Sequence, residues 1–207
     1  MNFRTHSHRH GLLLAENNRK FSETWYNLVN TITSITDEEI ITEHQSITRE
    51  PKSISQAVNR LLKEKLIANE WHEESAIFQN DTGYTDNRWR LDFAKDLLSV
   101  EVAFNHGEAI AWNLIKPVLA SELNHVAKEI QTELGVIICA TADLKEQGGF
   151  DSAVGEFEKF LRYLEPLQNM LSVPLIIIGL EAPETFKIEH RIVGGKKIGD
   201  VIILENH

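Results

Sequence analysis

The chain has 207 residues, of which 42% are hydrophobic and 25% are charged, the balance of a soluble globular protein. No apolar run approaches the roughly 20 residues of a membrane span, and the N-terminal patch "GLLLA" is too short for a signal peptide. The formal net charge of −10 counts against nucleic-acid binding, which relies on basic side chains. It does not exclude it, because a DNA cleft needs only a local basic lining.

Three further expectations follow from the same features. Without a membrane span or a leader, the protein is expected to contact no membrane and to be cytoplasmic. Cys139 is alone, which fits a reducing compartment. No repeat, low-complexity tract or Pro/Gly-rich linker interrupts the sequence, so residues 1–207 are expected to form a single domain.

The first half of the chain is predicted to be mainly helical. Residues 21–35 place apolar side chains at helical intervals, with Ser22 available as a cap. Residues 53–71 show a clearer helical pattern that begins just after Pro51. Residues 80–90 are rich in turn formers and predict a loop.

The second half alternates between strands and helices. "LDFAKDLLSVEVAF" (91–104) has the pattern of two short strands with a turn between them. A helical pattern over 107–134 contains Pro117, which predicts a kink or break. The remaining predicted elements are a buried strand over 135–141, a helix over 151–171 capped by Asp151 or Ser152, a buried strand over 173–180, a turn at Gly194-Gly195 and the short terminal strand "DVIIL". This order predicts an α/β fold in which helices flank a mixed sheet.

Two carboxylates lie in the 91–104 hairpin. Asp92 and Glu101 are nine positions apart, which a tight hairpin places side by side. Val100, Val102 and Phe104 are expected to point into the core and Glu101 to the opposite, polar side. Such a pair could hold Mg²⁺, which prefers hard oxygen ligands. The alternative is a solvated strand Glu and a turn Asp, because the spacing is short and common.

The hairpin also resembles a known family. "DFAKDLLSVEVAF" is similar to the core of the BglII/BstYI group of type II restriction endonucleases, in the PD-(D/E)XK superfamily. "NRLLKEKLIANEW" (59–71), "GVIICATADL", "VPLIIIGL" and "HGLLLAEN" resemble other segments of that family in the same order. The resemblance runs loosely from about residue 10 to residue 183, and it assigns no role to the stretch after Ala182.

This resemblance implies a restriction-endonuclease-like fold and a homodimer that cleaves duplex DNA with Mg²⁺ at a specific site. A two-fold dimer implies a palindromic target, and the family suggests one centred on GATC. Asp92 and Glu101 match the catalytic, metal-binding carboxylates, and Glu74 matches a further ligand position. For Glu73 and Glu74 the alternative is a charged loop. The apolar excess of 107–134 makes that segment the expected dimer surface.

Ala103 departs from the family, which has Gln at this position where the wider superfamily has Lys or Glu. Such a side chain orients or activates the attacking water, which a methyl group cannot do. The role could have moved to Glu108, His106 or Lys116, the explanation that we favour. Otherwise the protein is a DNA-binding protein that cuts weakly or not at all, or Ala103 is an engineered substitution. A third possibility is an interaction protein whose carboxylates are incidental.

Two segments are candidates for reading DNA. Residues Asn105 and His106 follow the second strand of the hairpin, where the family enters the major groove, and both side chains can hydrogen-bond to purine edges. The alternative is a polar turn with Asn105 as a helix cap. The loop 142–152 is expected to lead into a helix N-terminus that suits phosphate or base contact, with Lys145, Gln147 and Ser152 as contributors.

Several other residues have simpler interpretations. His6, His8 and His10 alternate and would line one face of a strand, where they could bind a transition metal, although an incidental cluster is the simpler interpretation. Lys196 and Lys197 could touch phosphate but fit a solvated turn. Trp25, Trp71 and Trp112 are expected in the core, while Trp89, between two arginines, could lie against DNA.

Overall fold

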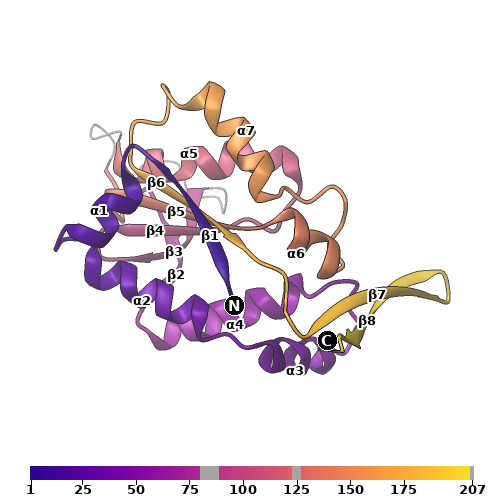
Figure 1. Ribbon diagram of the computed structural model, residues 1–207. Helices are drawn as coiled ribbons and strands as arrows, with labels where there is room; N and C mark the ends of the chain where they lie inside the picture. The colour runs from indigo at the N-terminus through magenta and orange to yellow at the C-terminus, as the bar shows by residue number, and fades with distance from the viewer. Residues whose placement is uncertain (80–88, 123–126, 206–207) are drawn as a thin grey trace.

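The computed structural model describes residues 1–79, 89–122 and 127–205. Within these ranges a mixed sheet of six strands has the order β1-β6-β5-β4-β3-β2 (Figure 1). Its strands are β1 Phe3–His8, β2 His72–Ala76, β3 Arg90–Lys95, β4 Leu98–Val102, β5 Leu134–Ala140 and β6 Leu175–Leu180. β4, β5 and β6 run parallel, and the other pairs are antiparallel. The predicted mixed sheet is confirmed.

The two apolar runs form the centre of this sheet. Every residue of β5 and of β6 is buried, as expected of strands that are covered on both faces. β1 pairs with β6 at one edge and β2 with β3 at the other. The sheet therefore places the β3–β4 hairpin next to its buried centre.

Helices cover both faces of the sheet. α1 Gly11–Asn17, α2 Ser22–Thr33, α3 Asp37–Ser46 and α4 Ser55–Ala68 lie on one face, and α5 Ile110–Ser121 and α7 Phe157–Leu167 on the other (Figure 1). Alternate residues of β5 divide between the two cores: Val136 and Ile138 pack with the first set of helices, and Ile137 with the second. The helices predicted over 21–35 and 53–71 are confirmed, although Ser22 begins α2 and makes no cap bond.

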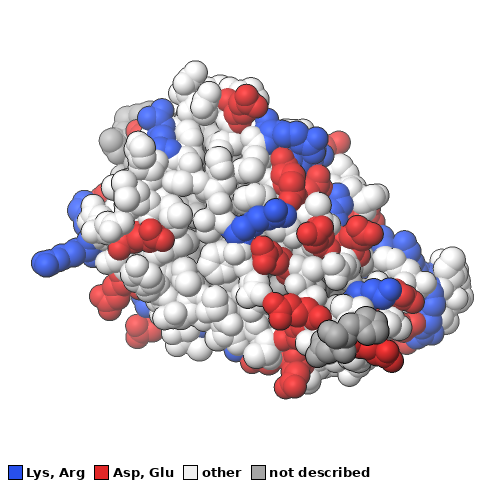
Figure 2. All heavy atoms as spheres, viewed as in Figure 1, with Lys and Arg blue, Asp and Glu red and all other residues white. Residues whose placement is uncertain are grey.

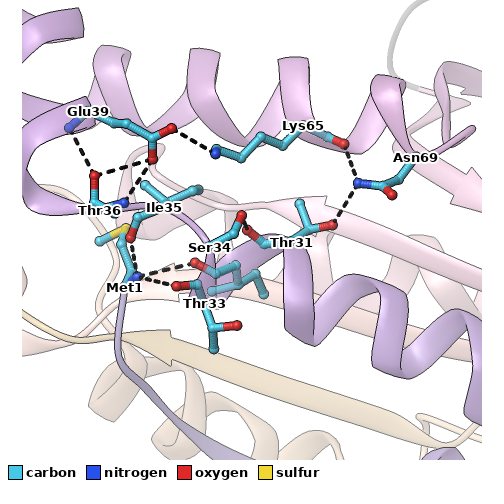
Figure 3. A network of polar contacts seen from close by, with 10 residues as sticks. Met1, Thr31, Thr33, Ser34, Ile35, Thr36, Glu39, Lys65 and Asn69 are labelled. Carbon is cyan, nitrogen blue, oxygen red and sulfur yellow. Dashed lines mark hydrogen bonds and ion pairs between the residues drawn. The ribbon is translucent and has the colours of Figure 1, made fainter.

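Helix α3 carries start signals that the apolar periodicity does not reveal. Thr36 accepts a hydrogen bond from the Glu39 backbone N–H and Glu39 reaches back to Thr36, a complete capping box. Lys65 of α4 donates to Glu39 at 2.8 Å, and Asn69 donates to Thr31 of α2 at 3.3 Å. This network joins α2, α3 and α4 (Figure 3).

The segment 107–134 differs from its prediction. α5 passes through Pro117 without a break and ends at Ser121, and residues 127–133 form no helix. Instead the Gln79 N–H donates to the Ala127 carbonyl at 3.1 Å, and the Glu129 N–H donates to the Ile77 carbonyl at the same distance. These strand-like bonds to 77–79 satisfy backbone groups that a helix would otherwise satisfy.

The helix predicted over 151–171 begins later, at Phe157. Asp151 caps no helix, because its carboxylate accepts from the Ala153 N–H at 3.1 Å and pairs with Lys52 at 2.7 Å. Residues 142–147, expected in a loop, form the short helix α6 Ala142–Gln147, which is capped by Thr141. These local polar bonds of Asp151 and Thr141 outweigh the helical periodicity of residues 151–171, so the helix begins only after residue 156.

The C-terminal residues 186–203 form a long hairpin, whose second strand includes most of the predicted terminal strand "DVIIL". β7 Phe186–Val193 and β8 Lys196–Ile203 are joined by Gly194 and Gly195, which have φ of 55° and 79° and confirm the predicted turn. The hairpin projects from the body of the molecule (Figure 1). At its base, Nε2 of His44 lies 2.9 Å from the Gly199 carbonyl.

The charge is distributed unevenly over the face that carries β1. Acidic side chains gather over α3 and near the start of β7, while basic ones lie on the hairpin (Figure 2). α3 has acidic residues throughout its first turn, and the hairpin carries Lys187, Arg191, Lys196 and Lys197.

Among the described residues, no helix has the length and apolar character that crossing a membrane requires.

Candidate active site

The β3–β4 hairpin brings the two predicted carboxylates together. Phe93 pairs with Val100, so the same register continued by one residue sets Asp92 opposite Glu101. Oδ2 of Asp92 accepts a hydrogen bond from the Val102 N–H at 2.7 Å. The turn at 96–97 is fixed by Asp96, which has φ of 50° and accepts from the Thr24 hydroxyl at 2.6 Å.

Glu101 is buried, contrary to the prediction of a polar side for its strand. Its relative exposure is 2%, although Val100, Val102 and Phe104 pack into the first core as predicted. β4 is an interior strand of the sheet, and α5 covers the face that carries Glu101. Polar and apolar side chains alternate along β4 because its two faces differ. Both faces are nevertheless buried, and neither is exposed to solvent.

Helix α5 supplies a cation to this buried carboxylate. Nζ of Lys116 lies 2.5 Å from Oε2 of Glu101, and the two side chains are 11% and 2% exposed. The other carboxylate oxygen, Oε1, is buried and has no hydrogen-bond partner among the described residues. A buried acceptor without a partner is costly, so this oxygen is suited to bind a metal ion.

The electrostatics of the pair favour an added cation. Burial, together with the charge of Asp92, raises the pKa of Glu101 to about 8, although Lys116 acts in the opposite direction. Burial also raises the pKa of Asp92, against the effects of Lys116 and of the Val102 N–H. One ammonium does not compensate a buried and a half-buried carboxylate, and a divalent cation would favour the ionised form of both.

The raised pKa predicts how stability depends on pH without metal. The unfolded chain releases the Glu101 proton near the ordinary pKa of 4.5 and the folded chain near 8. The folded state therefore holds the extra proton between these values, and its stability falls as pH rises through this window, by at most about 1.4 kcal/mol per pH unit.

We expect Glu101→Gln to flatten this fall, because it removes the titrating group. The measurement is chemical denaturation of both proteins, in a chelator, between about pH 5 and about pH 8. Saturating Mg²⁺ should also flatten the fall in the parent, because it favours the ionised carboxylates. Equal slopes for the parent and the variant in the chelator would contradict the burial of Glu101.

Comparisons with known proteins identify the family of the chain. The family model described as restriction endonuclease BglII/BglIII matches residues 3–180. The chain belongs to this restriction endonuclease family. The fold resembles a crystal structure of BglII complexed with a DNA 16-mer, with a TM-score of 0.67, 15% identity and coverage of 99% of this chain and 100% of that one. Free BglII gives a TM-score of 0.55, 13% identity and the same coverage. No curated protein matches the sequence.

Membership of the BglII/BglIII family establishes the class of activity. The protein is a type II site-specific deoxyribonuclease that acts on DNA, and enzymes of this family generally use a divalent metal ion. The restriction-endonuclease-like fold predicted from the sequence is confirmed.

Ala103 stands at the position where the sequence resemblance predicts a polar side chain. It is 1% exposed and packs in the second core with Ile110 and Leu114 of α5. Of the three side chains considered as replacements, Lys116 reaches Glu101. His106 and Glu108 are exposed and lie 3.8 Å from each other. The structure therefore favours Lys116 over His106 and Glu108, a choice that sequence spacing alone cannot make.

Glu74 lies on β2, beside β3. Glu73 pairs with Phe93 and Ser75 with Leu91, so Glu74 lies between them at the level of Asp92. Its side chain is exposed and its φ is 48°, which departs from strand geometry. The described residues contain no group of three His, Cys, Asp or Glu side chains poised to hold a metal. The role of Glu74 as a ligand stays a prediction.

The two predicted DNA-reading segments lie side by side. His106 forms a bridge with Val154, and the Gly155 N–H donates to the Asn105 carbonyl at 3.1 Å. Asn105, His106 and Ser152 are exposed. The cap of the short 3₁₀ turn Gly107–Ala109 is His106, not Asn105.

Other sequence candidates are placed differently. Lys145 lies on α6 and pairs with Glu156 at 2.6 Å, and both side chains are largely buried. It therefore does not project freely into solvent. Trp89 packs edge-on against Trp112 and Phe78, with ring centroids 5.4 and 5.7 Å away. Most of the loop predicted over 80–90 lies outside the described residues.

The N-terminal histidines form no metal site in the described part of the chain. His6 and His8 lie on β1, while His10 follows the strand with a left-handed φ of 58°. Nε2 of His8 lies 2.9 Å from the Leu171 carbonyl. The expectation that three alternating histidines share one strand face is therefore wrong for His10.

Proposed function

We propose that this protein hydrolyses phosphodiester bonds of duplex DNA at a short palindromic site with Mg²⁺ held by Asp92 and Glu101. One observation carries the proposal. Oε1 of Glu101 is buried and has no hydrogen-bond partner within residues 1–79, 89–122 and 127–205. It lies beside a second carboxylate whose Oδ2 is fixed by a backbone N–H at 2.7 Å. Hard carboxylate oxygens are the ligands that Mg²⁺ prefers.

The residues present fit such an ion. When bound, Mg²⁺ would make a water more acidic and stabilise charge on the phosphate oxygens. The rest of the chemistry belongs to the chain. Val102 holds the Asp92 carboxylate in position through its backbone N–H, and α5 shields Glu101 from bulk solvent. Low exposure strengthens every charge interaction within the site.

The same architecture supports site-specific recognition. Asn105, His106 and Ser152 present polar groups from two adjoining loops, and such groups can read base edges in the major groove. Lys145 could contribute only after exchanging its pairing with Glu156 for a phosphate. We take residues 1–207 as one endonuclease domain.

A palindromic target follows if two copies assemble around a two-fold axis, because each copy then meets the same half-site. The apolar residues of α5 suggested a dimer surface. Some of them pack within the chain instead, since Trp112 packs on Trp89. The choice of a GATC-centred target rests on the family resemblance alone.

A mapped DNA substrate tests these proposals together. With Mg²⁺ we expect discrete fragments whose sequenced ends define one palindrome centred on GATC, and size measurements should give a dimer. Ends at another sequence would contradict the GATC centre alone. DNA binding without cleavage would favour the alternative of a weak or inactive binder, which Ala103 motivates because no side chain at that position can orient water.

A further inference from the structure

We propose that Lys116, on helix α5, is a catalytic residue whose ammonium group holds the attacking water. It takes the water-positioning role that the methyl group of Ala103, on the strand, cannot fill. This rests on the proposed function. The proposal rests on how helix α5 lies against strand β4. A buried lysine of the helix meets Glu101 at 2.5 Å, on the face of β4 that also carries Ala103.

The position of Lys116 is set by the packing of α5 on the sheet. The next residue, Pro117, lies so close to Gly135 of β5 that a Cβ added at Gly135 would be 2.4 Å from the Pro117 Cβ. Gly135 pairs with Ser99 of β4, two residues before Glu101. This close approach of helix and strand brings the Lys116 side chain to the carboxylates.

The ammonium group has hydrogen-bonding capacity to spare. It carries three N–H donors, and the acceptor that it contacts within the described residues is Oε2 of Glu101. Lys116 is 9% exposed, so its remaining donors need partners inside the site. In the part of the chain that the structure describes, Oε1 of Glu101 also has no hydrogen-bond partner. Unused donors beside an unused acceptor form a site for a water molecule.

In the cleavage step this water would be the nucleophile. Its oxygen forms a bond to phosphorus while the bond from phosphorus to one ester oxygen breaks. One water proton leaves to solvent, and the departing ester oxygen takes up a proton from solvent, so that atoms and charge balance. A hydrogen bond from Lys116 to the water oxygen orients it and stabilises the negative charge that it gains.

A purely structural role would be to compensate the burial of Glu101. That role alone is a weak reason for the pair, because desolvation of two charges commonly cancels their attraction and well-packed apolar residues are often as stable. The two roles predict different measurements. Compensation affects stability and metal affinity, whereas water positioning affects the cleavage rate when both DNA and Mg²⁺ are already bound.

The test is single-turnover cleavage by Lys116→Met with DNA and Mg²⁺ both saturating. We expect the rate to fall by about 100-fold or more, while DNA affinity in a chelator stays within about threefold of the parent. Mg²⁺ affinity, measured by calorimetry, should be unchanged or tighter, because a repelling charge is removed. Lys65→Met is the matched control, since it breaks a 2.8 Å ion pair with Glu39 between α4 and α3, and it should cleave at the parent rate.

Two further variants keep the test decisive if Lys116→Met does not fold. Lys116→Gln keeps an N–H donor toward Glu101 and should fold where Met does not, and it should also cleave slowly because it lacks the ammonium. In Lys116→Ala, added ethylamine should restore part of the rate. A folded Lys116→Met or Lys116→Gln that cleaves within about threefold of the parent at saturation overturns the role of Lys116 and leaves the proposed function intact. A parent that does not cleave overturns both.

Discussion

Asp92→Asn is expected to lose cleavage by roughly 10³-fold or more while the protein stays folded, because several kcal/mol of charge stabilisation in the transition state would be lost with the metal ligand. The substitution is nearly isosteric. An amide oxygen can still accept the Val102 N–H, which now donates to Oδ2 of Asp92 at 2.7 Å. The measurements are single-turnover cleavage and Mg²⁺ binding by calorimetry.

The hairpin offers a control for this experiment. Asp96→Asn alters a carboxylate in the turn of the same hairpin, which also accepts one short hydrogen bond, from the Thr24 hydroxyl at 2.6 Å. It should keep both Mg²⁺ affinity and cleavage, because Asp96 lies at the opposite end of the strands from Glu101. If Mg²⁺ affinity were the same in Asp92→Asn as in the parent, the metal site would not be where we place it.

Gly135→Ala is the second change with a large expected effect. The added Cβ would lie 2.4 Å from the Pro117 Cβ and 2.7 Å from a methyl carbon of Leu175, so α5 must move away from the sheet. Overpacking of this kind costs about 1–3 kcal/mol of stability. Because Lys116 precedes Pro117, we expect the shift to weaken the contact with Glu101 and to lower single-turnover cleavage by about 10-fold or more.

Loss of stability alone must be separated from this displacement. Leu62→Ala truncates a fully buried side chain of α4 on the opposite face of the sheet, at a cost of about 2–5 kcal/mol. Assayed well below its melting temperature, it should cleave DNA at nearly the parent rate. Equal losses of cleavage in both variants would show that α5 has no special part in the site.

Local patterns in the sequence predict the site only in part. The nine-residue separation of Asp92 and Glu101 suffices to pair them, because a tight hairpin fixes its register locally. The burial of Glu101 could not be inferred in this way. Alternation along one strand shows that two faces differ, but whether the second face meets solvent or a helix depends on elements far away in the sequence.

The missed elements have a similar cause. Helix α3 has little apolar periodicity, and its start is marked by the capping box of Thr36 and Glu39. β1 forms because β6 offers an edge for backbone pairing, which no side-chain pattern encodes. In the C-terminal hairpin, the sequence predicted the Gly194-Gly195 turn, where positive φ values favour glycine, and the end of the second strand, but not the first strand.

The sequence by itself determined the α/β class, the two buried strands, the hairpin with its carboxylate pair and the resemblance to restriction endonucleases, because these depend on short-range periodicity and ordered motifs. The tertiary structure alone decided that the carboxylate is buried and that Lys116, fifteen residues along the chain from Glu101, reaches it at 2.5 Å. That contact depends on how closely α5 approaches β5 at Gly135. Such an approach is set by packing between elements and not by the spacing of residues within one.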